Sequence, residues 1–306
     1  MDAEAVAQVR RFNRLVTQRV GALTDRFLAR ERSLGEARLL WEIGAAGPEG
    51  RDVRSLRGQL GLDSGYLSRL LQALQASGLI TVGPKESDRR VRVARLTKRG
   101  LAERVVLDRR SDEVAESILA PLSASQRTRL TAAMTEVERL LTATMVEIAP
   151  MDSHDPQARY CLNAYFAELD QRFETGFDPE LSIPAGAAEL RAPTGLLLVA
   201  TLRGEPIGCG GLKFHDGEPT EIKRMWIAPS ARGLGVGRRL LAELEHQAAL
   251  HGASAVRLET NKSLVEAISL YQSAGFVEVK PYNDEPYAHH WFEKPLAADT
   301  VGRTRR

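Results

Sequence analysis

One stretch, from Arg224 to Leu244, constrains the fold more than any other part of the chain. It starts with the apolar run Met225-Trp226-Ile227, which Pro229 closes and which predicts a buried strand. A glycine-rich turn follows at residues 232–237, and leucines at helical spacing then predict a helix. Glycines let backbone amides converge without a Cβ in the way, and free amides at a helix start attract anions. The stretch therefore predicts a strand, a phosphate-binding turn and a helix.

A glycine turn by itself is equally consistent with a tight strand-to-helix connection. Here Arg232, Gly235 and Gly237 form the pattern R-x-x-G-x-G, and no Lys-Ser/Thr pair follows as in a Walker loop. Further residues downstream fit the same pattern, namely Glu259-Thr260-Asn261, Ala267, Leu270-Tyr271 and Gly275-Phe276. Over residues 155–297 the sequence resembles the GNAT family of acetyl-CoA-dependent N-acetyltransferases, which implies an α/β fold with a mixed, mostly antiparallel sheet.

The resemblance implies that acetyl-CoA is the cofactor and that the glycine-rich turn holds its pyrophosphate. Backbone amides of the preceding strand are then expected to polarise the thioester carbonyl. Asn261, at the end of a strand expected over 255–260, is expected to contact the pantetheine arm or nearby backbone. The coenzyme-binding residues expected on this basis are Met225, Trp226, Ile227, Arg232, Gly233, Leu234, Gly235, Val236, Gly237, Arg238 and Asn261.

Acetyl transfer to an amine requires a proton acceptor for the amine and a proton donor for the departing thiolate. Glu221 is the expected acceptor, because it lies six residues before Ile227, as the catalytic Glu does in histone-type members of the family. Strand alternation would place residues 221, 223, 225 and 227 on one face. Tyr271 is the expected donor, by its match to the family Tyr near the coenzyme sulfur. The alternatives are a surface ion pair for Glu221 and a packed helix residue for Tyr271.

Metal and disulfide chemistry have little support in the sequence. His289 and His290 lack carboxylate or Cys partners at ligand spacing, so no metal site is expected. Cys161 and Cys209 are too few for a disulfide framework, which fits a reducing cytoplasm. No apolar run approaches the roughly 18 residues of a membrane span, and the N-terminus does not resemble a signal peptide.

Charge divides the chain into unlike halves. Residues 1–145 hold 25 Lys/Arg and 18 Asp/Glu, or +7, and the remaining residues hold 17 and 22, or −5. In the basic half, Asp63 is the expected N-cap of a helix over 64–77 that follows a short helix and a Gly turn. A basic β-hairpin is expected after it, over residues 79–96. This order is the helix-turn-helix pattern with an adjoining wing, which favours double-stranded DNA as a partner.

The run D-S-G-Y-L-S-R-L-L-Q-A-L-Q-A-S-G-L-I, followed by D-R-R-V-R-V-A-R-L-T-K-R-G, resembles the winged helix of the MarR family of bacterial regulators. The resemblance covers roughly residues 1–147 and implies that Asp88 orients Arg90 toward DNA. The residues expected to contact DNA are Ser64, Tyr66, Ser68, Arg69, Arg89, Arg90 and Arg92. The Gly65-Tyr66 pair departs from the family pattern and leaves the preferred DNA sequence open.

The resemblance also implies a homodimer through the first and last helices of this half. A helix over 3–30 and another over 125–148 carry the apolar stripes that would form it. The expected organisation is a mainly α, MarR-like winged helix-turn-helix domain at 1–148, a linker at 149–156, a GNAT domain at 157–297 and a disordered tail at 298–306.

The sequence leaves three hypotheses open. The first is a working acetyltransferase that acetylates an unidentified amine acceptor and also binds DNA. The second is a transcriptional regulator whose GNAT module only senses acetyl-CoA. In the third, the front half no longer binds DNA and serves only as a dimerisation scaffold. Neither the acceptor nor any coupling between the modules follows from the sequence.

Overall fold

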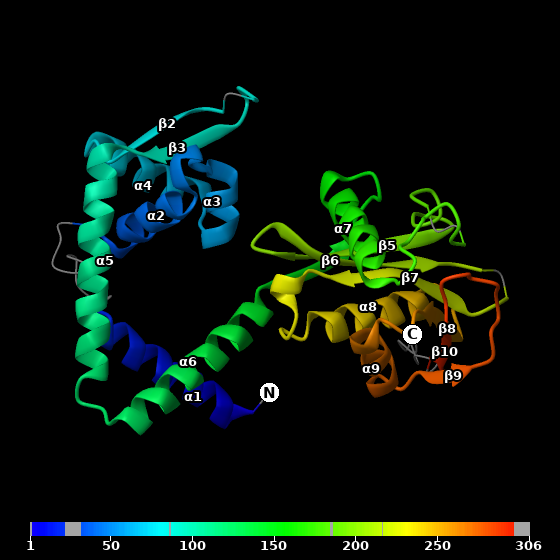
Figure 1. Cartoon of the computed structure of the whole chain (residues 1–306). Helices are drawn as coiled ribbons and strands as arrows, with labels where there is room; N and C mark the ends of the chain where they lie inside the picture. Colours follow the sequence, from blue (N-terminus) through cyan, green and yellow to red (C-terminus); the bar gives the residue numbers. More distant parts are fainter. Residues whose placement is uncertain (1, 22–31, 86, 184–185, 216, 297–306) are drawn as a thin grey trace, which may run out of the picture. The chain divides into compact units, whose positions relative to one another are not determined.

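The computed structural model describes residues 2–21, 32–85, 87–183, 186–215 and 217–296. It separates into two compact units, residues 1–136 and 137–306, which are treated individually below (Figure 1). The expected tail at 298–306 lies outside the described residues. The helix expected over 3–30 is too long, because it ends at Arg19 with Val20 as its C-cap and Gly21 in a left-handed turn; residues 22–30 of that expectation lie outside the described residues. No described helix is both long and apolar enough to cross a bilayer.

The first unit contains helices around a small sheet. The helices are α1 (Ala3–Arg19), α2 (Leu34–Ala45), α3 (Val53–Leu60), α4 (Ser64–Ala76), α5 (Lys98–Leu119) and the start of α6 (Ala124–Thr144). The strands β1 (Arg51–Asp52), β2 (Ile80–Pro84) and β3 (Arg92–Leu96) form an antiparallel sheet in the order β1-β3-β2. Asp63 caps α4 by accepting from the Tyr66 amide, so the expected N-cap is confirmed. The expected hairpin is also present, between Ile80 and Leu96.

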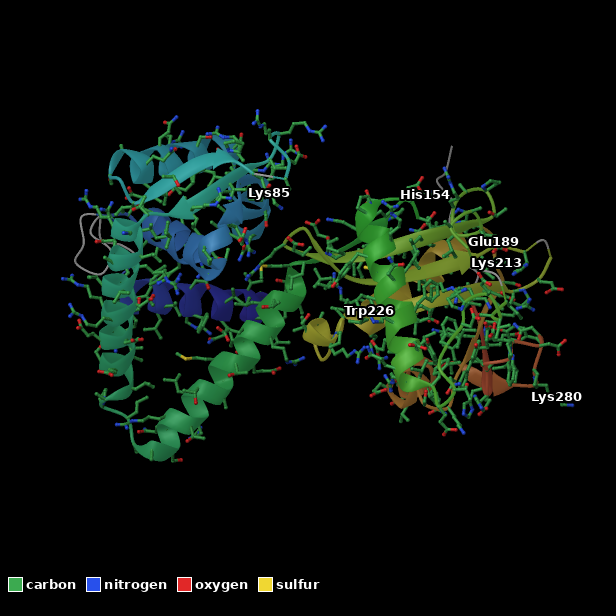
Figure 2. All side chains as sticks on the ribbon, turned by 45° about the horizontal axis from the view of Figure 1, so that its top comes forward. Lys85, His154, Glu189, Lys213, Trp226 and Lys280 are labelled. Carbon is green, nitrogen blue, oxygen red and sulfur yellow. The ribbon has the colours of Figure 1, made fainter. Side chains whose placement is uncertain are left out.

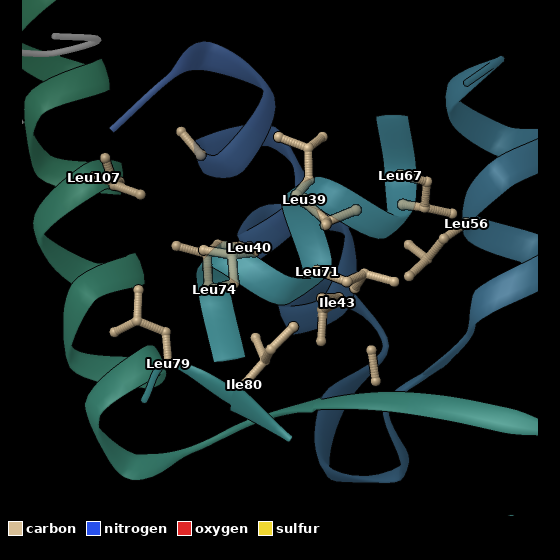
Figure 3. Packing of buried hydrophobic residues seen from close by; sticks show 13 residues of the cluster. Leu39, Leu40, Ile43, Leu56, Leu67, Leu71, Leu74, Leu79, Ile80 and Leu107 are labelled. Carbon is tan, nitrogen blue, oxygen red and sulfur yellow. The ribbon is translucent and has the colours of Figure 1, made fainter. Parts of the chain in front are cut away.

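A leucine-rich core fixes α4 and the hairpin in this unit. Figure 3 shows Leu39, Leu40 and Ile43 of α2 packed with residues from α3, α4, β2 and α5. Leu67, Leu70, Leu71 and Leu74 of α4 all face this core, so the rest of that helix faces solvent. In contrast, α1 has no buried residue at all.

The second unit is built on a seven-stranded sheet in the order β4-β5-β6-β7-β8-β10-β9. The strands are β4 (Val146–Pro150), β5 (Gly195–Leu202), β6 (Glu205–Lys213), β7 (Thr220–Ile227), β8 (Ala255–Thr260), β9 (Val277–Val279) and β10 (His290–Pro295). Only the β7–β8 pair is parallel. The expected mixed, mostly antiparallel sheet is thus confirmed.

Helices cover both faces of this sheet. Figure 1 shows α7 (Pro156–Arg172) on one face, and α8 (Val236–Leu250) with α9 (Val265–Ser273) on the other. Two cores correspond to these faces: Ala158 and Cys161 of α7 belong to one, and Leu240, Leu244 and Tyr271 of α8 and α9 belong to the other.

The predicted boundary between the modules is wrong in its details. The helix expected over 125–148 ends at Thr144, and Val146–Pro150 forms edge strand β4 instead of a helix end and linker. Val146 pairs with Leu202, and Pro150 with Leu198. Val146 is buried, and an edge strand tolerates Pro150 because its missing amide is not needed on the outer side. The segment is therefore part of the sheet.

Candidate active site

Strands β7 and β8 open away from each other near the middle of the sheet. They pair at only two positions, Thr220 with Val256 and Glu221 with Arg257, although each strand continues well beyond them. The part of β7 from Lys223 to Ile227 therefore has no hydrogen-bonded neighbour on its β8 side. Backbone polar groups in such an opening are available to a ligand that lies between the strands.

A β-bulge at Arg224 interrupts β7 at this opening. Cys209 pairs with Trp226, and Gly211 pairs with Lys223, so two residues of β7 oppose the single residue Gly210 of β6. Arg224 adopts a left-handed backbone conformation with φ of 58°. A non-glycine residue in this region is strained, and such strain is concentrated at functional positions.

The bulge changes which face the following side chains occupy. Met225 lies on the α9 side of the sheet, where its sulfur is 3.9 Å from the Tyr271 hydroxyl oxygen. Trp226 lies on the α7 side and donates from Nε1 to Glu168 at 2.8 Å, as its position beside α7 in Figure 2 illustrates. Arg224 also lies on the α7 side, against the rings of Tyr165 and Phe166.

The expectation that Glu221 shares a face with Met225 and Ile227 is therefore wrong, because the extra residue reverses the alternation after Lys223. Glu221 is 5% exposed and lines neither cavity described below. Its carboxylate accepts from Arg257 at 3.0 and 3.2 Å and lies 3.4 Å from Lys223 Nζ. Burial opposes ionisation, but Lys223, His215 and Arg257 outweigh it and hold the pKa of Glu221 below its usual value.

The larger cavity, of about 510 Å³, follows the glycine-rich turn and is called the cofactor cavity here. Gly233 and Gly235 adopt φ of 79° and 76°, and a Cβ at either position would meet open space. Gly235 precedes α8 without any side-chain cap, so the first amides of α8 keep free donors. These features fit a diphosphate held by backbone amides at a helix N-terminus.

Most of the expected coenzyme-binding residues line this cavity: Met225, Trp226, Ile227, Arg232, Gly233, Gly235, Val236, Gly237 and Arg238. Leu234 does not, because it packs against the core on the α7 side. Asn261 lines the second cavity instead, where it donates to the Tyr287 carbonyl oxygen at 2.7 Å. Contact of any of these residues with the coenzyme stays a prediction.

Glu168 of α7 also lines the cofactor cavity, and its importance was not apparent from the sequence. Its carboxylate accepts from Trp226 Nε1 and forms ion pairs with Arg172 and Arg232, the latter at 2.5 Å. Burial raises the pKa of Glu168, but the hydrogen bonds from Trp226 and Arg232 outweigh burial and lower it overall. Glu168 thereby fixes the position of the motif arginine.

A smaller cavity of about 90 Å³ lies on the other side of Met225 and is called the acceptor cavity here. Its wall is aromatic, with Phe173, Phe177 and Tyr287 in mutual ring contact at centroid distances of 4.8 to 5.8 Å. Its charged lining consists of Lys223, Arg224, Glu259 and Glu285. Sequence reasoning assigned no site role to any of these four residues, although Glu259 belongs to the downstream family pattern. Two of the aromatic residues, Phe177 and Tyr287, come from loops without a periodic pattern.

Tyr271 lines both cavities. Tyr271 is 6% exposed, and among the described residues its hydroxyl group has only the weak contact with the Met225 sulfur. Burial raises the pKa of Tyr271 far above its usual value, with Tyr165 and Glu259 adding to the effect. Tyr271 therefore stays protonated throughout the physiological range.

The other candidate residues occupy separate places. Ser64, Tyr66, Ser68, Arg69, Arg89, Arg90 and Arg92 are all exposed on α4 and the β2–β3 hairpin, whose turn carries Lys85 (Figure 2). Asp88 and Arg90 form an ion pair at 3.2 Å. His290 pairs with Glu278, and no three potential metal ligands cluster within the described residues.

Comparison with known proteins connects the second unit to acetyl transfer. A sequence model described as the acetyltransferase (GNAT) family matches residues 162–276. A protein named IAA acetyltransferase from Azospirillum brasilense is 35% identical over 133 residues, which are 42% of this chain and 86% of that protein. A GNAT acetyltransferase structure from Staphylococcus aureus is 16% identical with a TM-score of 0.43, and one from Elizabethkingia anophelis with acetyl-CoA bound is 21% identical with a TM-score of 0.37. Each match covers 50% of this chain and 99% of the other.

Proposed function

The chain belongs to the GNAT family and is an N-acetyltransferase that uses acetyl-CoA, and from this premise we propose that it acetylates a small amine held in the acceptor cavity. We also propose that the first unit binds DNA. The observation that carries the acetylation proposal is the junction of the two cavities, since Tyr165, Met225 and Tyr271 line both. An acceptor amine and a thioester that meet at this junction would both lie beside Tyr165, Met225 and Tyr271, so the amine could approach the thioester carbon directly.

The coenzyme would enter along the cofactor cavity, with its diphosphate on the amides around Gly235. The thioester would then lie beside residues 225–227, where β7 lacks a partner strand. A backbone amide in this opening would polarise the thioester carbonyl, which is the usual way to stabilise the charge that develops there. Acetyl-CoA supplies the activated acyl group, and the residues around the opening hold that group in position for attack.

Glu285 takes over the role that the sequence suggested for Glu221. Its Oε2 accepts from Ser182 Oγ at 3.0 Å and from the Ile183 amide at 2.7 Å. Among the residues that the structure describes, its Oε1 accepts only from the Tyr287 amide, at 3.4 Å, and so retains capacity for an ammonium group. Glu285 would take one proton from the ammonium group and free the lone pair of the nitrogen to attack the thioester carbon.

Tyr271 would complete the transfer. As the carbon–sulfur bond breaks, its hydroxyl group gives a proton to the leaving thiolate. The nitrogen loses its second proton when the amide forms, and solvent carries that proton away and reprotonates Tyr271. The products are the N-acetylated acceptor and the free thiol.

Steady-state thiol release with acetyl-CoA and a panel of small amines tests this function directly. Turnover of at least one amine is expected, and Glu285→Gln is expected to lower kcat about 100-fold with coenzyme affinity retained. The alternative, a module that only senses acetyl-CoA, predicts coenzyme binding without turnover of any amine. Unchanged turnover in Glu285→Gln would refute the assignment of Glu285 and leave the activity standing.

The DNA-binding proposal rests on the exposed face of α4 and the basic hairpin beside it. Arg69 stacks on the Tyr66 ring at 5.6 Å, and the hairpin presents Arg89, Arg90 and Arg92 to solvent. Arg90 is 91% exposed while Asp88 holds it, which matches the wing arrangement implied by the resemblance to MarR regulators. Exposed arginines of this kind serve phosphate and minor-groove contacts.

Replacing Arg69 and Arg90 with Ala tests DNA binding. The double variant is expected to bind the promoter fragment of its own gene at least tenfold more weakly and with a shallower salt dependence. The exposed Arg203, in the second unit, offers a matched control as Arg203→Ala. Equal affinity of the unaltered protein for promoter and random DNA would refute a sequence-specific regulator.

The proposed homodimer rests on α1, where Val6, Val9, Phe12, Leu15, Val16 and Val20 are all exposed. A helix with an apolar stripe and no buried residue requires a partner, because contiguous exposed apolar surface is unfavourable in water. A second copy of this chain is the partner that the resemblance to MarR regulators implies. Light scattering would measure whether the protein has the mass of a dimer in solution.

A further inference from the structure

Arg224 stands apart from the other buried cations of the second unit. Arg224 is only 9% exposed, and its Nε has no hydrogen-bond partner among the described residues. Lys223, Arg257 and Arg172 all pair with carboxylates, whereas Arg224 forms no ion pair with any carboxylate that the structure describes. A buried charge without a counterion is unfavourable, so the pocket around Arg224 is suited to receive an anion.

The surroundings of Arg224 hold the guanidinium in place without neutralising it. Its Cζ lies 5.0 Å from the centre of the Phe166 ring and 5.9 Å from that of Tyr165. Burial raises the pKa of Tyr165 to about 12, although the adjacent Arg224 lowers it, so the phenol stays neutral and supplies no negative charge. Aromatic stacking and a hydrogen bond with Tyr165 orient the guanidinium plane, and Nε keeps a donor without a partner among the described residues.

The anion that Arg224 would bind belongs to the acceptor and not to the coenzyme. Arg224 lines the acceptor cavity and is absent from the lining of the cofactor cavity, where the glycine-rich turn provides a separate anion site. Glu259 is paired with Lys223, but Glu285 has no cationic partner among the described residues and disfavours a doubly charged phosphate in a cavity of about 90 Å³. A carboxylate matches the fork of a single guanidinium.

The opposite charge is also represented in this cavity. Glu285 is 8% exposed and has no cationic partner within the described part of the chain. The cavity thus offers an unpaired guanidinium and an unpaired carboxylate, with an aromatic wall formed by Phe173, Phe177 and Tyr287. The volume is below the roughly 150 Å³ of an apolar cavity that holds benzene, which limits the apolar part of the ligand.

We propose that the acceptor is a free α-amino acid with a small apolar side chain, whose carboxylate binds Arg224 and whose ammonium group binds Glu285. This inference rests on the proposed acetylation of a small amine and names its substrate class. Arg224 then determines specificity, because an acceptor without a carboxylate leaves the buried guanidinium unpaired.

Matched acceptors test the proposal on the unaltered protein. Alanine and valine are compared with their carboxamides and with ethylamine and isobutylamine, by thiol release with saturating acetyl-CoA. We expect kcat/KM for the amino acids to exceed that for the carboxamides and amines by roughly 100-fold or more. Equal or better use of the acceptors that lack a carboxylate would overturn the proposal while leaving the acetyltransferase function intact.

Variants of Arg224 assign the preference to its guanidinium. Arg224→Gln should lower kcat/KM for amino acids about 100-fold and change that for amines less than threefold, and Arg224→Lys should restore part of the loss. Arg203→Gln is the matched control, since Arg203 also has a left-handed backbone conformation but its side chain is exposed. A uniform loss for every acceptor would mean that Arg224 is only structural and would refute its role.

Calorimetry separates failure of this inference from failure of the proposed function. Protein saturated with coenzyme A is titrated with alanine and with alaninamide, so that no turnover is needed. Tighter binding of alanine, lost in Arg224→Gln, would support the substrate class even if no acceptor were acetylated. Equal binding of both ligands would overturn it even if some amine were acetylated.

Discussion

Replacing Tyr271 with Phe removes one hydroxyl group at the junction of the two cavities and changes almost nothing else. The hydroxyl has only a weak contact at 3.9 Å with the Met225 sulfur, so its loss should cost less than about 1 kcal/mol of stability. If Tyr271 donates a proton to the leaving thiolate, kcat should fall roughly 100- to 1000-fold. That fall corresponds to about 3–4 kcal/mol in the activation barrier.

The assay is thiol release under saturating acetyl-CoA, with coenzyme affinity measured separately by calorimetry. Tyr160→Phe, an exposed tyrosine on α7, is the matched control and should retain full activity. A Tyr271→Phe variant within twofold of the unaltered kcat would refute the proton-donor role. A parallel loss of rate and coenzyme affinity would also refute it, because the residue would then act in binding.

The pH dependence gives a second check on Tyr271. Burial raises its folded-state pKa above the ordinary value of 10.0, so the phenol contributes full stability below pH 10. This contribution is lost only as pH rises through the higher folded value. The rate should accordingly show no alkaline decline from this group below about pH 10, and a decline near pH 8 that disappears in Tyr271→Phe would contradict the structure.

Three further predictions concern the turn, the buried carboxylate and the exposed helix. Gly235→Ala should cost roughly 1–2 kcal/mol of stability and weaken coenzyme binding about tenfold in calorimetry. Gly217→Ala is the control, because Gly217 has nearly the same φ of 75° and similar open space; it should cost as much stability and leave coenzyme binding unchanged. Glu221→Gln should destabilise by roughly 3 kcal/mol at pH 7, a difference that shrinks as pH falls through the lowered folded pKa; an altered pH–rate profile without loss of stability would restore its catalytic role. Phe12→Glu should convert a dimer to monomers in light scattering, and an unchanged mass would exclude α1 from the interface.

Local sequence patterns sufficed where structure follows from periodicity or from a short motif. The strand, turn and helix around Gly235 have this origin, as does the capping of α4 by Asp63. The strand expected over 255–260 is present with those bounds. In each case the determining interactions lie within a few residues along the chain.

The misplaced elements depend on contacts with distant segments. Val146–Pro150 has an apolar pattern that continues the preceding helix, and only pairing with β5 makes it a strand. The acceptor cavity draws Phe177 and Glu285 from two loops that are more than 100 residues apart. Neither loop carries a periodic signal, so the sequence could not select these residues.

The bulge at Arg224 explains why the family motif predicted which residues line the cofactor cavity but not which face of the sheet Glu221 occupies. The motif fixes backbone conformation from Met225 onward, and that segment lines the cofactor cavity. One extra residue before it sends Glu221 to the opposite face, into ion pairs with Lys223 and Arg257, and leaves Arg224 buried against aromatic rings. The bulge also brings Arg224, which has no ion-pair partner among the described residues, to the lining of the acceptor cavity. If Arg224 binds the acceptor carboxylate as proposed, deleting Arg224 should abolish any preference for alanine over alaninamide in thiol release. It should leave Glu221 on the face opposite Met225, because Met225 would then follow Lys223 directly and strand alternation places neighbouring residues on opposite faces.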